Sequence, residues 1–309
     1  PAGQDVKIGE RVLRKGISLR PAAIGMLSSI GHNTVTVIRR PIISILSTGD
    51  ELLEPGDSYT TGKIYDSNSY GVAAAVLEAG GVPKNLGIAN DNIESVTAKI
   101  QAGLSSDMII TSAGVSKGDY DMIKEVLANH GQIDFWSVRM KPAKPLAFGL
   151  LDAGQNRQVP HIGLPGNPVS ALIAFEQFAK PAIHKMMGKL DRPKPTIKAI
   201  LDQPIHNTDG RRVYARVIVT RKDNVIHARL TGHQGSNILT SMVQANGLAI
   251  CPETVQNINA GDLVDVQMLD WPEDIVSWET NNLLVTMRKN WNKPNIVLTT
   301  VKLRTWGAR

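Results

Sequence analysis

The sequence predicts an α/β protein in which a three-layer domain with a mostly parallel sheet precedes a small β domain. Residues 42–163 alternate short apolar runs with helical patterns, which is typical of layered folds with parallel strands. After Gly188 the pattern changes to short alternating strands separated by polar turns. The segment 191–195 contains two prolines, which stiffen it and cannot continue a helix, so we place the linker there.

The elements of the α/β domain follow one another with local signals at their ends. A buried strand over 42–46 precedes a helix over 68–79, and Gly80 and Gly81 end this helix because glycine tolerates left-handed backbone. The further elements are a strand near 84–88, a helix opened by the capping pattern Asp91-x-x-Glu94 and ending near Leu104, a strand at 108–110, a helix over 119–129, strands at 135–140 and 161–164, and a long apolar helix over 167–187 that Pro181 kinks.

The β domain is predicted to contain four strands, at 212–220, 225–230, 248–250 and 263–268. The chain is therefore divided into a strand-and-helix segment over 1–39, the α/β domain over 40–188, the β domain over 189–275 and a tail over 276–309 to which we assign no role.

Composition excludes several classes of protein. No apolar run in the 309 residues approaches the ~20 needed to cross a bilayer, so no membrane protein is expected. The single Cys251 cannot form an intrachain disulfide, which fits a reducing cytoplasm, and the scattered histidines lack zinc-site spacing. The net charge of +6 suits an anionic partner. Nucleic acid is not expected, because no basic stripe interleaved with aromatic residues occurs.

Polar loops follow the predicted strands, and ligands of open α/β sheets bind beyond the carboxyl ends of the strands. In the loop 47–51, Asp50 offers a site for magnesium or a ligand hydroxyl, with a tight turn and solvated acids as the alternative. In the loop 62–68, Asp66 and Asn68 precede a helix N-terminus, which can bind an anion or a polar ring. Asp66 could equally be a helix cap.

The loop 111–121 has the composition of a phosphate-binding segment. Gly114 and Gly118 let backbone N–H groups approach a phosphate closely, and Ser116 adds a hydroxyl. Asp121 could hold a divalent cation that bridges the same phosphate. The alternative is a flexible connection between strand and helix.

Two further loops are rich in proline. The segment 141–145, Lys-Pro-Ala-Lys-Pro, holds two ammonium groups on restricted backbone, so less entropy is lost when both bind one anion. A solvated basic turn is the alternative. In the segment 164–170, Asn167 can cap the long helix and Pro168 can occupy its first position, so capping alone could explain that loop.

Taken together, these loops resemble the molybdopterin molybdenumtransferase family, which includes MoeA and the gephyrin E domain. The matching motifs are Ser-Thr-Gly-Asp-Glu-Leu at 47–52, Ile-Tyr-Asp-Ser-Asn at 64–68, Gly-Val-Ser-x-Gly-x-x-Asp at 114–121, Lys-Pro-x-Lys-Pro at 141–145, Leu-Pro-Gly-Asn-Pro-Val-Ser at 164–170, Gly-Arg at 210–211 and Thr-Gly-His-Gln-Gly-Ser at 231–236. The resemblance covers about residues 1–270.

The resemblance implies a molybdopterin-binding domain of the MoaB/MogA-like type, followed by a C-terminal β-barrel. Residues 1–39 would be the remnant of a larger N-terminal region. The implied reaction binds adenylylated molybdopterin and molybdate together, releases AMP with Mg²⁺ or another divalent cation, and passes molybdenum to the dithiolene. A cytoplasmic homodimer is expected, with the molybdopterin adenylyltransferase as a candidate partner.

Matched position by position, the resemblance also assigns roles to residues. The catalytic residues would be Asp50, Asp121, Lys141 and Lys144, with Asp50 and Asp121 holding the cation. The substrate-binding residues would be Asp66, Asn68, Gly114, Ser116, Gly118, Pro145, Pro165, Pro168, Arg211 and Ser236. This sequence departs from the family at Ala113 and Ala143, where glycine is common, and at Val213, where an acid is usual.

Two alternatives belong to other functional classes. A molybdopterin adenylyltransferase would share the loops at 66–68 and 114–118, but the β domain and the motif at 141–145 argue against it. A scaffold similar to gephyrin would use the same domains to bind a peptide instead of a pterin. Molybdate insertion is the function that the motifs favour.

Overall fold

The computed structural model describes residues 1–113, 125–127, 130–189 and 194–272, and within them the predicted α/β architecture is confirmed. The first sheet has the order β4 (Val82–Ala89), β1 (Ile42–Thr48), β5 (Met108–Ala113), β9 (Gln158–Pro165), β8 (Pro145–Asp152) and β6 (Gly131–Ser137). The first four strands are parallel, and β8 and β6 are antiparallel to their neighbours.

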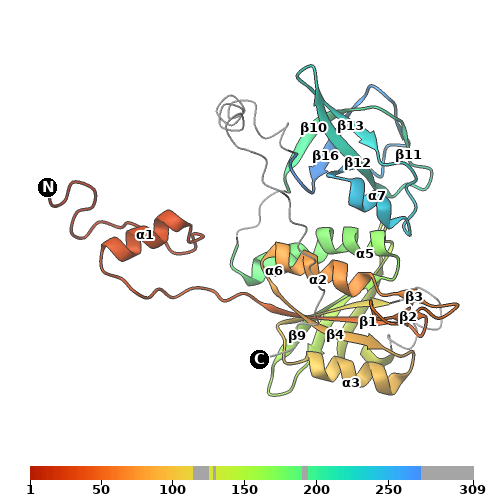
Figure 1. The fold of residues 1–309 in the computed structure, drawn as a ribbon, viewed down its shortest axis with the longest axis horizontal. Coiled ribbons are helices and arrows are strands. Elements are labelled where there is room, and N and C mark those ends of the chain that lie inside the picture. Colours follow the sequence, from red (N-terminus) through yellow and green to blue (C-terminus); the bar gives the residue numbers. More distant parts are fainter. Residues whose placement is uncertain (114–124, 128–129, 190–193, 273–309) are drawn as a thin grey trace.

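Helices cover both faces of this sheet (Figure 1). The helices α2 (Asn68–Ala79), α5 (Pro168–Ala174) and α6 (Lys180–Met186) lie on one face, and α3 (Ile93–Gly103) lies on the other. Because both faces are covered, β1 is buried from Ile43 to Thr48 and has no alternating polar face. The helix α2 has the predicted bounds and ends at Gly80, whose φ of 95° is left-handed.

Three local predictions are corrected. The cap of α3 is Asn92, whose Oδ1 accepts the N–H of Ser95 at 2.7 Å, and not Asp91. The predicted long helix consists of α5 and α6, joined by the π-helical segment 175–179. This segment directly precedes the turn that contains Pro181, where the α-helical pattern is disturbed because proline lacks the N–H and its ring clashes with the preceding turn. The strand predicted over 135–140 is two strands, β6 and the short β7 (Met140–Lys141).

Other elements extend the prediction. The strands β8 and β10 (Thr196–Leu201) were not predicted, and the short β2 (Leu52–Leu53) and β3 (Ile64–Tyr65) pair beside β1. Residues 125–127 and 130 are helical, while the rest of the helix predicted over 119–129 lies outside the described residues, as does the tail over 276–309. Among the described residues, no helix is long and apolar enough to cross a membrane.

The β domain forms a closed barrel. Its strands follow the order β13 (Val225–Leu230), β10, β16 (Leu263–Met268), β14 (Gly247–Cys251) and β12 (Arg212–Lys222), and β12 pairs back to β13. Closure satisfies the edge strands that an open sheet would expose. A separate apolar core that includes Val217, Ala249 and Val266 fills the barrel. The short β11 (Ile205–His206), β15 (Asn257–Ile258) and α7 (Leu239–Gln244) lie around it.

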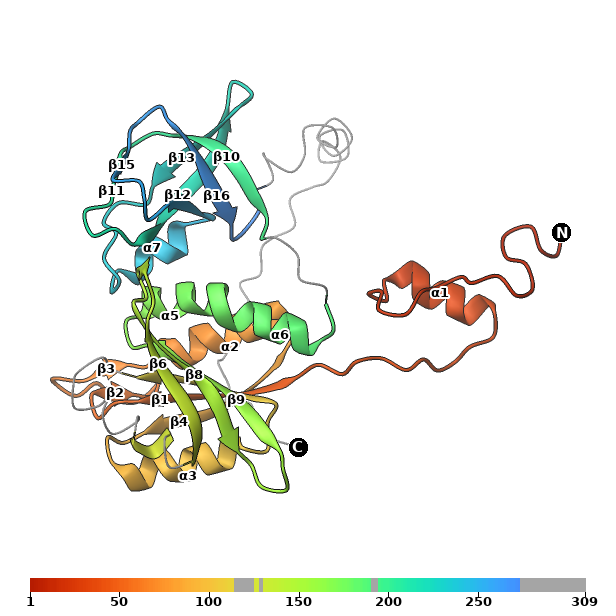
Figure 2. The ribbon, with the colours of Figure 1, turned by 180° about the vertical axis from the view of Figure 1, so that it is seen from behind.

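Specific contacts hold the barrel beside α2 and α5, as Figures 1 and 2 show. The strand β7 pairs in parallel with the start of β12, with Met140 opposite Arg212 and Lys141 opposite Val213. The backbone N–H of Val169 at the start of α5 donates to the carbonyl of Ser236 at 3.1 Å. Backbone of the two domains is therefore joined in two places.

Most of the first 39 residues lie apart from this body (Figures 1 and 2), and the segment meets it at its end, where Arg39 pairs with Asp107. The segment contains the helix α1 (Pro21–Ser29), which buries none of its residues, and the strand predicted there is absent from residues 1–39. No strand of the described sheets pairs with residues 1–39, so nothing stabilises the strand that was predicted there.

His161 makes the stability of the sheet domain depend on pH. This fully buried histidine on β9 shares a hydrogen bond of 3.0 Å between its Nε2 and the Thr111 hydroxyl on β5, and burial lowers its pKa to about 3. It therefore stays neutral in the folded protein at pH values where the unfolded chain, with an ordinary pKa of 6.5, is protonated.

We expect His161→Gln to make the unfolding free energy less dependent on pH. The parent's unfolded state binds one more proton below pH 6.5, so this group removes about 1 kcal/mol of stability per pH unit as pH falls toward 3. Urea unfolding at several pH values between 7 and 5 measures the slope. The matched control is the exposed His32→Gln, which should keep the parent's slope. Equal slopes in His161→Gln and the parent would contradict the assignment.

Candidate active site

The carboxyl ends of three parallel strands lie in register at one edge of the first sheet. Thr48 of β1 is opposite Ala113 of β5, and Ala113 is opposite Pro165 of β9. The loops that leave these strands therefore start side by side, which is where ligands of open α/β sheets bind. The predicted Pro165 is buried at this edge.

Asn68 holds several of these loops together. Its side-chain amide at the start of α2 donates to the Ser112 hydroxyl of β5 at 2.7 Å and to the Gly166 carbonyl after β9 at 2.7 Å. The hydroxyls of Ser47 and Thr48 are buried near the same edge and have no hydrogen-bond partner among the described residues. Buried polar atoms are rarely left unpaired, so these two hydroxyls are suited to meet a polar ligand group.

Asp50 and Asp91 form a reciprocal pair at the ends of β1 and β4. The backbone N–H of Asp50 donates to Asp91 Oδ2 at 3.0 Å, and the N–H of Asp91 donates to Asp50 Oδ1 at 3.0 Å. The sequence analysis missed Asp91 as a site residue because the helix pattern explained it. The available signal was its place after β4, the neighbour of β1.

This pair suits a divalent cation such as Mg²⁺. Magnesium binds through one or two carboxylates together with substrate phosphates, and here Asp50 is exposed and Asp91 is partly exposed. No cluster of three histidine, cysteine or acidic side chains that could hold a metal occurs in the described part of the chain, so this pair is the candidate there. Asp121, which was predicted to hold the cation together with Asp50, lies outside the described residues, as do Gly114, Ser116 and Gly118.

Asp66 has the contacts of a helix cap. Its Oδ1 accepts the N–H groups of Asn68 and Ser69 at 3.0 and 3.1 Å, and its Oδ2 accepts the Ser69 hydroxyl at 2.5 Å. The carboxylate is buried and committed to the start of α2. It thereby fixes Asn68 at the site, while direct contact of Asp66 with a substrate stays a prediction.

The two predicted lysines flank a strained turn. Ala143 between them has a φ of 73°, a left-handed conformation that glycine adopts more readily. The Lys144 side chain is exposed, and the backbone carbonyl of Lys144 accepts the N–H of Val138 at 2.7 Å. Pro145 follows as the first residue of β8. The turn thus anchors backbone and leaves the Lys144 ammonium free to move.

The barrel brings Arg211 to Lys141. Asp209 Oδ2 accepts a hydrogen bond from Arg211 Nη2 and lies 3.6 Å from Lys141 Nζ. The hydrogen bond from Arg211, followed by the charges of Arg211 and Lys141, outweighs the effect of burial and lowers the pKa of Asp209 to about 2. Lys141 and Arg211, predicted separately from two domains, therefore belong to one cluster of charges. Asp209 was not predicted.

Ser236 lies where the barrel meets the sheet domain. Its carbonyl accepts the Val169 N–H in the first turn of α5, next to the predicted Pro168. The fully buried Arg216, which the sequence analysis also missed, donates to the Gly235 carbonyl at 3.0 Å and to the Ser241 hydroxyl at 3.1 Å. Arg216 thereby fixes the loop that carries Ser236.

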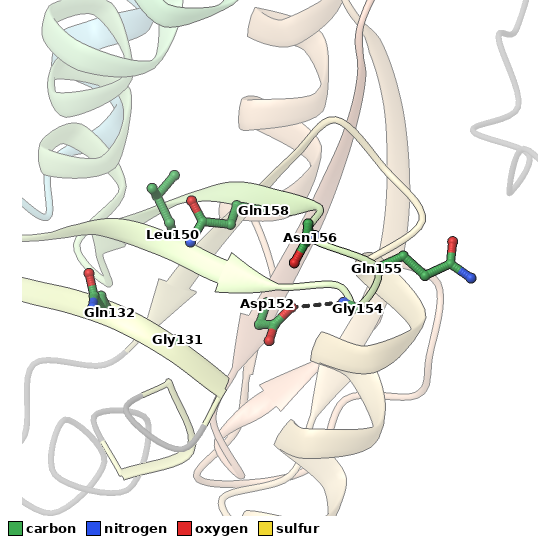
Figure 3. A pocket seen from close by; sticks show the side chains of 8 residues that line it. All are labelled: Gly131, Gln132, Leu150, Asp152, Gly154, Gln155, Asn156 and Gln158. Atoms are coloured by element: carbon green, nitrogen blue, oxygen red, sulfur yellow. Dashed lines mark hydrogen bonds between the residues drawn. The ribbon is translucent and has the colours of Figure 1, made fainter.

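A shallow hollow of about 480 Å³ lies elsewhere on the sheet domain (Figure 3). It is lined by residues where β6 and β9 begin and β8 ends, among them Gln132, Asp152 and Gln158. Since β9 begins there, the hollow lies at the edge opposite the carboxyl ends of β1, β5 and β9. It is not part of the candidate site.

Two family models match the chain. The probable molybdopterin binding domain matches residues 44–185, and the MoeA C-terminal region (domain IV) matches residues 198–269. The matched regions contain the sheet domain and the barrel.

Similar proteins have been named in other organisms. A molybdopterin molybdenumtransferase of Haemophilus influenzae is 36% identical over 86% of this chain and 65% of its own length. Molybdopterin molybdenumtransferase 2 of Mycobacterium tuberculosis is 34% identical with the same coverage. A molybdopterin biosynthesis MoeA protein of Pyrococcus horikoshii superposes with a TM-score of 0.71 at 28% identity, covering 84% of this chain and 62% of that one. The chain spans just under two thirds of these relatives.

We expect Asp66→Ala to lower the unfolding free energy by about 2 kcal/mol, because a helix cap is lost and two backbone N–H groups lose their acceptor in a buried site. Asp66→Asn should cost less, since the amide oxygen can still accept from the backbone. The exposed Asp57→Ala is the control for the loss of one acid. Chemical denaturation measures all three variants, and parent-like stability of Asp66→Ala would refute the capping role.

Proposed function

Since this chain belongs to the MoeA family, we propose that it acts as a molybdopterin molybdenumtransferase, which inserts molybdate into adenylylated molybdopterin and releases AMP. The observation that carries the proposal is the cluster of Lys141 and Arg211, two cations that different domains bring to one place. A doubly charged oxyanion beside a nucleotide phosphate needs several fixed cations, because the two anions repel each other.

The pterin nucleotide would bind along the aligned carboxyl ends of β1, β5 and β9. Asn68 would orient the loops around it, and Gly114, Ser116 and Gly118 would give backbone N–H groups and a hydroxyl to its phosphates. The proline-rich segments at 141–145 and 164–170 would form the wall of the pocket. Restricted backbone in that wall keeps the pocket shape with little loss of entropy on binding.

Mg²⁺ is the divalent cation that the acidic residues suit. Asp50 and Asp91 would hold it, with Asp121 as a further ligand. When bound, the cation supplies positive charge that offsets the charge of the phosphoanhydride. Water cleaves the bond between the pterin phosphate and AMP, so each product carries a phosphate group and AMP leaves.

Molybdate would bind between the two domains. Lys141, Lys144 and Arg211 would neutralise its charge, and the Ser236 hydroxyl would donate to one of its oxygens. The hydrogen bond from the Val169 N–H to the Ser236 carbonyl fixes the distance between Ser236 and the sheet domain. Molybdenum would then be close to the dithiolene of the bound pterin, which is the proximity that ligand exchange requires.

The proposal extends to the setting of the protein. It includes a homodimer in the cytoplasm, and the molybdopterin adenylyltransferase as the partner that delivers the adenylylated pterin. The dimer and the partner are carried over from the family resemblance. A homodimer would be checked by the mass in solution, and delivery by comparing turnover with and without the adenylyltransferase.

We expect Lys144→Ala and Asp50→Ala each to reduce molybdate-dependent AMP release by about a hundredfold or more, because each removes charge that the reacting anions or their cation require. The readout is AMP formed from adenylylated molybdopterin with and without molybdate, with a thermal melt to verify folding. Lys222→Ala, at an exposed barrel hairpin, is the matched control and should keep parent activity.

Two results would contradict the proposal in different ways. Near-parent turnover in both Lys144→Ala and Asp50→Ala would remove these residues from the reaction. Transfer of AMP from ATP onto molybdopterin by the parent would instead assign the chain to the adenylyltransferases.

A further inference from the structure

The Asp209 carboxylate pairs with Lys141 and Arg211, the two cations that the proposed oxyanion would need. It accepts a hydrogen bond from Arg211 Nη2 and lies 3.6 Å from Lys141 Nζ. Its Oδ1 also accepts the backbone N–H of Arg211 at 3.4 Å. With Asp209 ionised, the three groups carry one net positive charge, and without it they would carry two. A dianion approaching Lys141 and Arg211 therefore meets a cluster that is already partly neutralised.

Other contacts hold Arg211 in position. The buried Asn207 donates from Nδ2 to the Arg211 carbonyl at 2.8 Å, and to the carbonyls of Pro252 and Val255. On the other side, Arg211 Nη1 reaches the Met140 carbonyl at 3.4 Å.

The backbone on both sides of the cluster is fixed by strand pairing. The strand β7 carries Lys141 and pairs with the start of β12, and the N–H of Arg212 donates to the Arg139 carbonyl at 2.9 Å. Hydrogen bonds that do not involve the Asp209 side chain thus define where the backbone of Lys141 and of Arg211 lies. The Asp209 carboxylate adds neutralising charge to the two side chains.

Asp209 is also able to move away. Its side chain is 34% exposed, and Gly210 beside it has a φ of 63°, which marks a turn at the surface. Exposed ion pairs contribute little net free energy, so rotation of the carboxylate into solvent costs little once an anion replaces it. Ionisation of the carboxylate persists at neutral pH, in keeping with its pKa of about 2.

We propose that Asp209 is an internal competitor for the anionic substrate: its carboxylate pairs with Lys141 and Arg211 in the unliganded protein and is displaced when a doubly charged oxyanion binds. This inference rests on the proposed function, since it takes Lys141 and Arg211 as the oxyanion site. The competition lowers affinity, favours dianions over monoanions, and returns a counter-ion to the cations when the anion leaves.

The test compares molybdate binding by the parent chain and by Asp209→Asn in isothermal titration calorimetry. Asparagine keeps an oxygen that can accept from the Arg211 N–H but removes the charge. We expect the dissociation constant to fall about fivefold, the size expected when two partly exposed ion pairs stop competing. Binding by Asp209→Asn should also weaken more steeply with added salt, because the cluster then carries one more positive charge.

The matched control is Asp265→Asn, which removes the same charge from the same barrel at the exposed pair with Lys198. It should bind molybdate as the parent does, and so separates local competition from a change in net charge. Asp209→Ala should bind at least as tightly as Asp209→Asn, and thermal melts verify that both variants fold.

The outcomes separate this inference from the proposed function. If the parent binds molybdate and Arg211→Ala weakens that binding, the oxyanion site stands. Equal or weaker binding by folded Asp209→Asn and Asp209→Ala then overturns the inference alone. If neither the parent nor Asp209→Asn binds molybdate, the proposed oxyanion site fails and the inference fails with it.

Discussion

The pairing of β7 with the start of β12 is the interaction on which the arrangement of the site depends. These two short stretches belong to different domains, yet they share a sheet and place Met140 opposite Arg212. Lys141 lies within this pairing and Arg211 directly precedes it, so backbone hydrogen bonds set the separation of the two backbones that carry these cations. A cationic site built from two domains would otherwise be as variable as the linker between them.

In the sheet domain, one side chain links the loops of the site. Parallel strands end at the same edge, where the loops that leave them need links to one another. Asn68 supplies such a link by donating to Ser112 and Gly166, and Asp66 fixes Asn68 by capping the same helix. The predicted residues at 66 and 68 thus act in sequence: the acid positions the amide, and the amide positions the loops.

Sequence reasoning succeeded where signals are local. The bounds of α2 follow from its apolar pattern and from Gly80, whose left-handed φ the structure has. It failed where the role of a residue depends on partners that are distant in the sequence. Asp91 matched a capping pattern, but its carboxylate pairs with residue 50 across the sheet edge. Asp209 and Arg216 carry no motif of their own, and only the closed barrel shows that one faces Lys141 and the other is buried.

Arg211, in the turn before β12, and Arg216, within β12, show how burial separates a structural charge from one that is suited to the proposed ligand. Arg216 is fully buried, burial lowers its pKa to about 10, and it bonds Gly235 and Ser241, so moving it would leave those groups without a donor. Arg211 is 25% exposed and its main counter-ion is a surface carboxylate. Exchanging that carboxylate for a bound anion exposes no buried group. Under the proposed function, Arg211 would therefore bind and release the anion while Arg216 keeps Ser236 in place against α5.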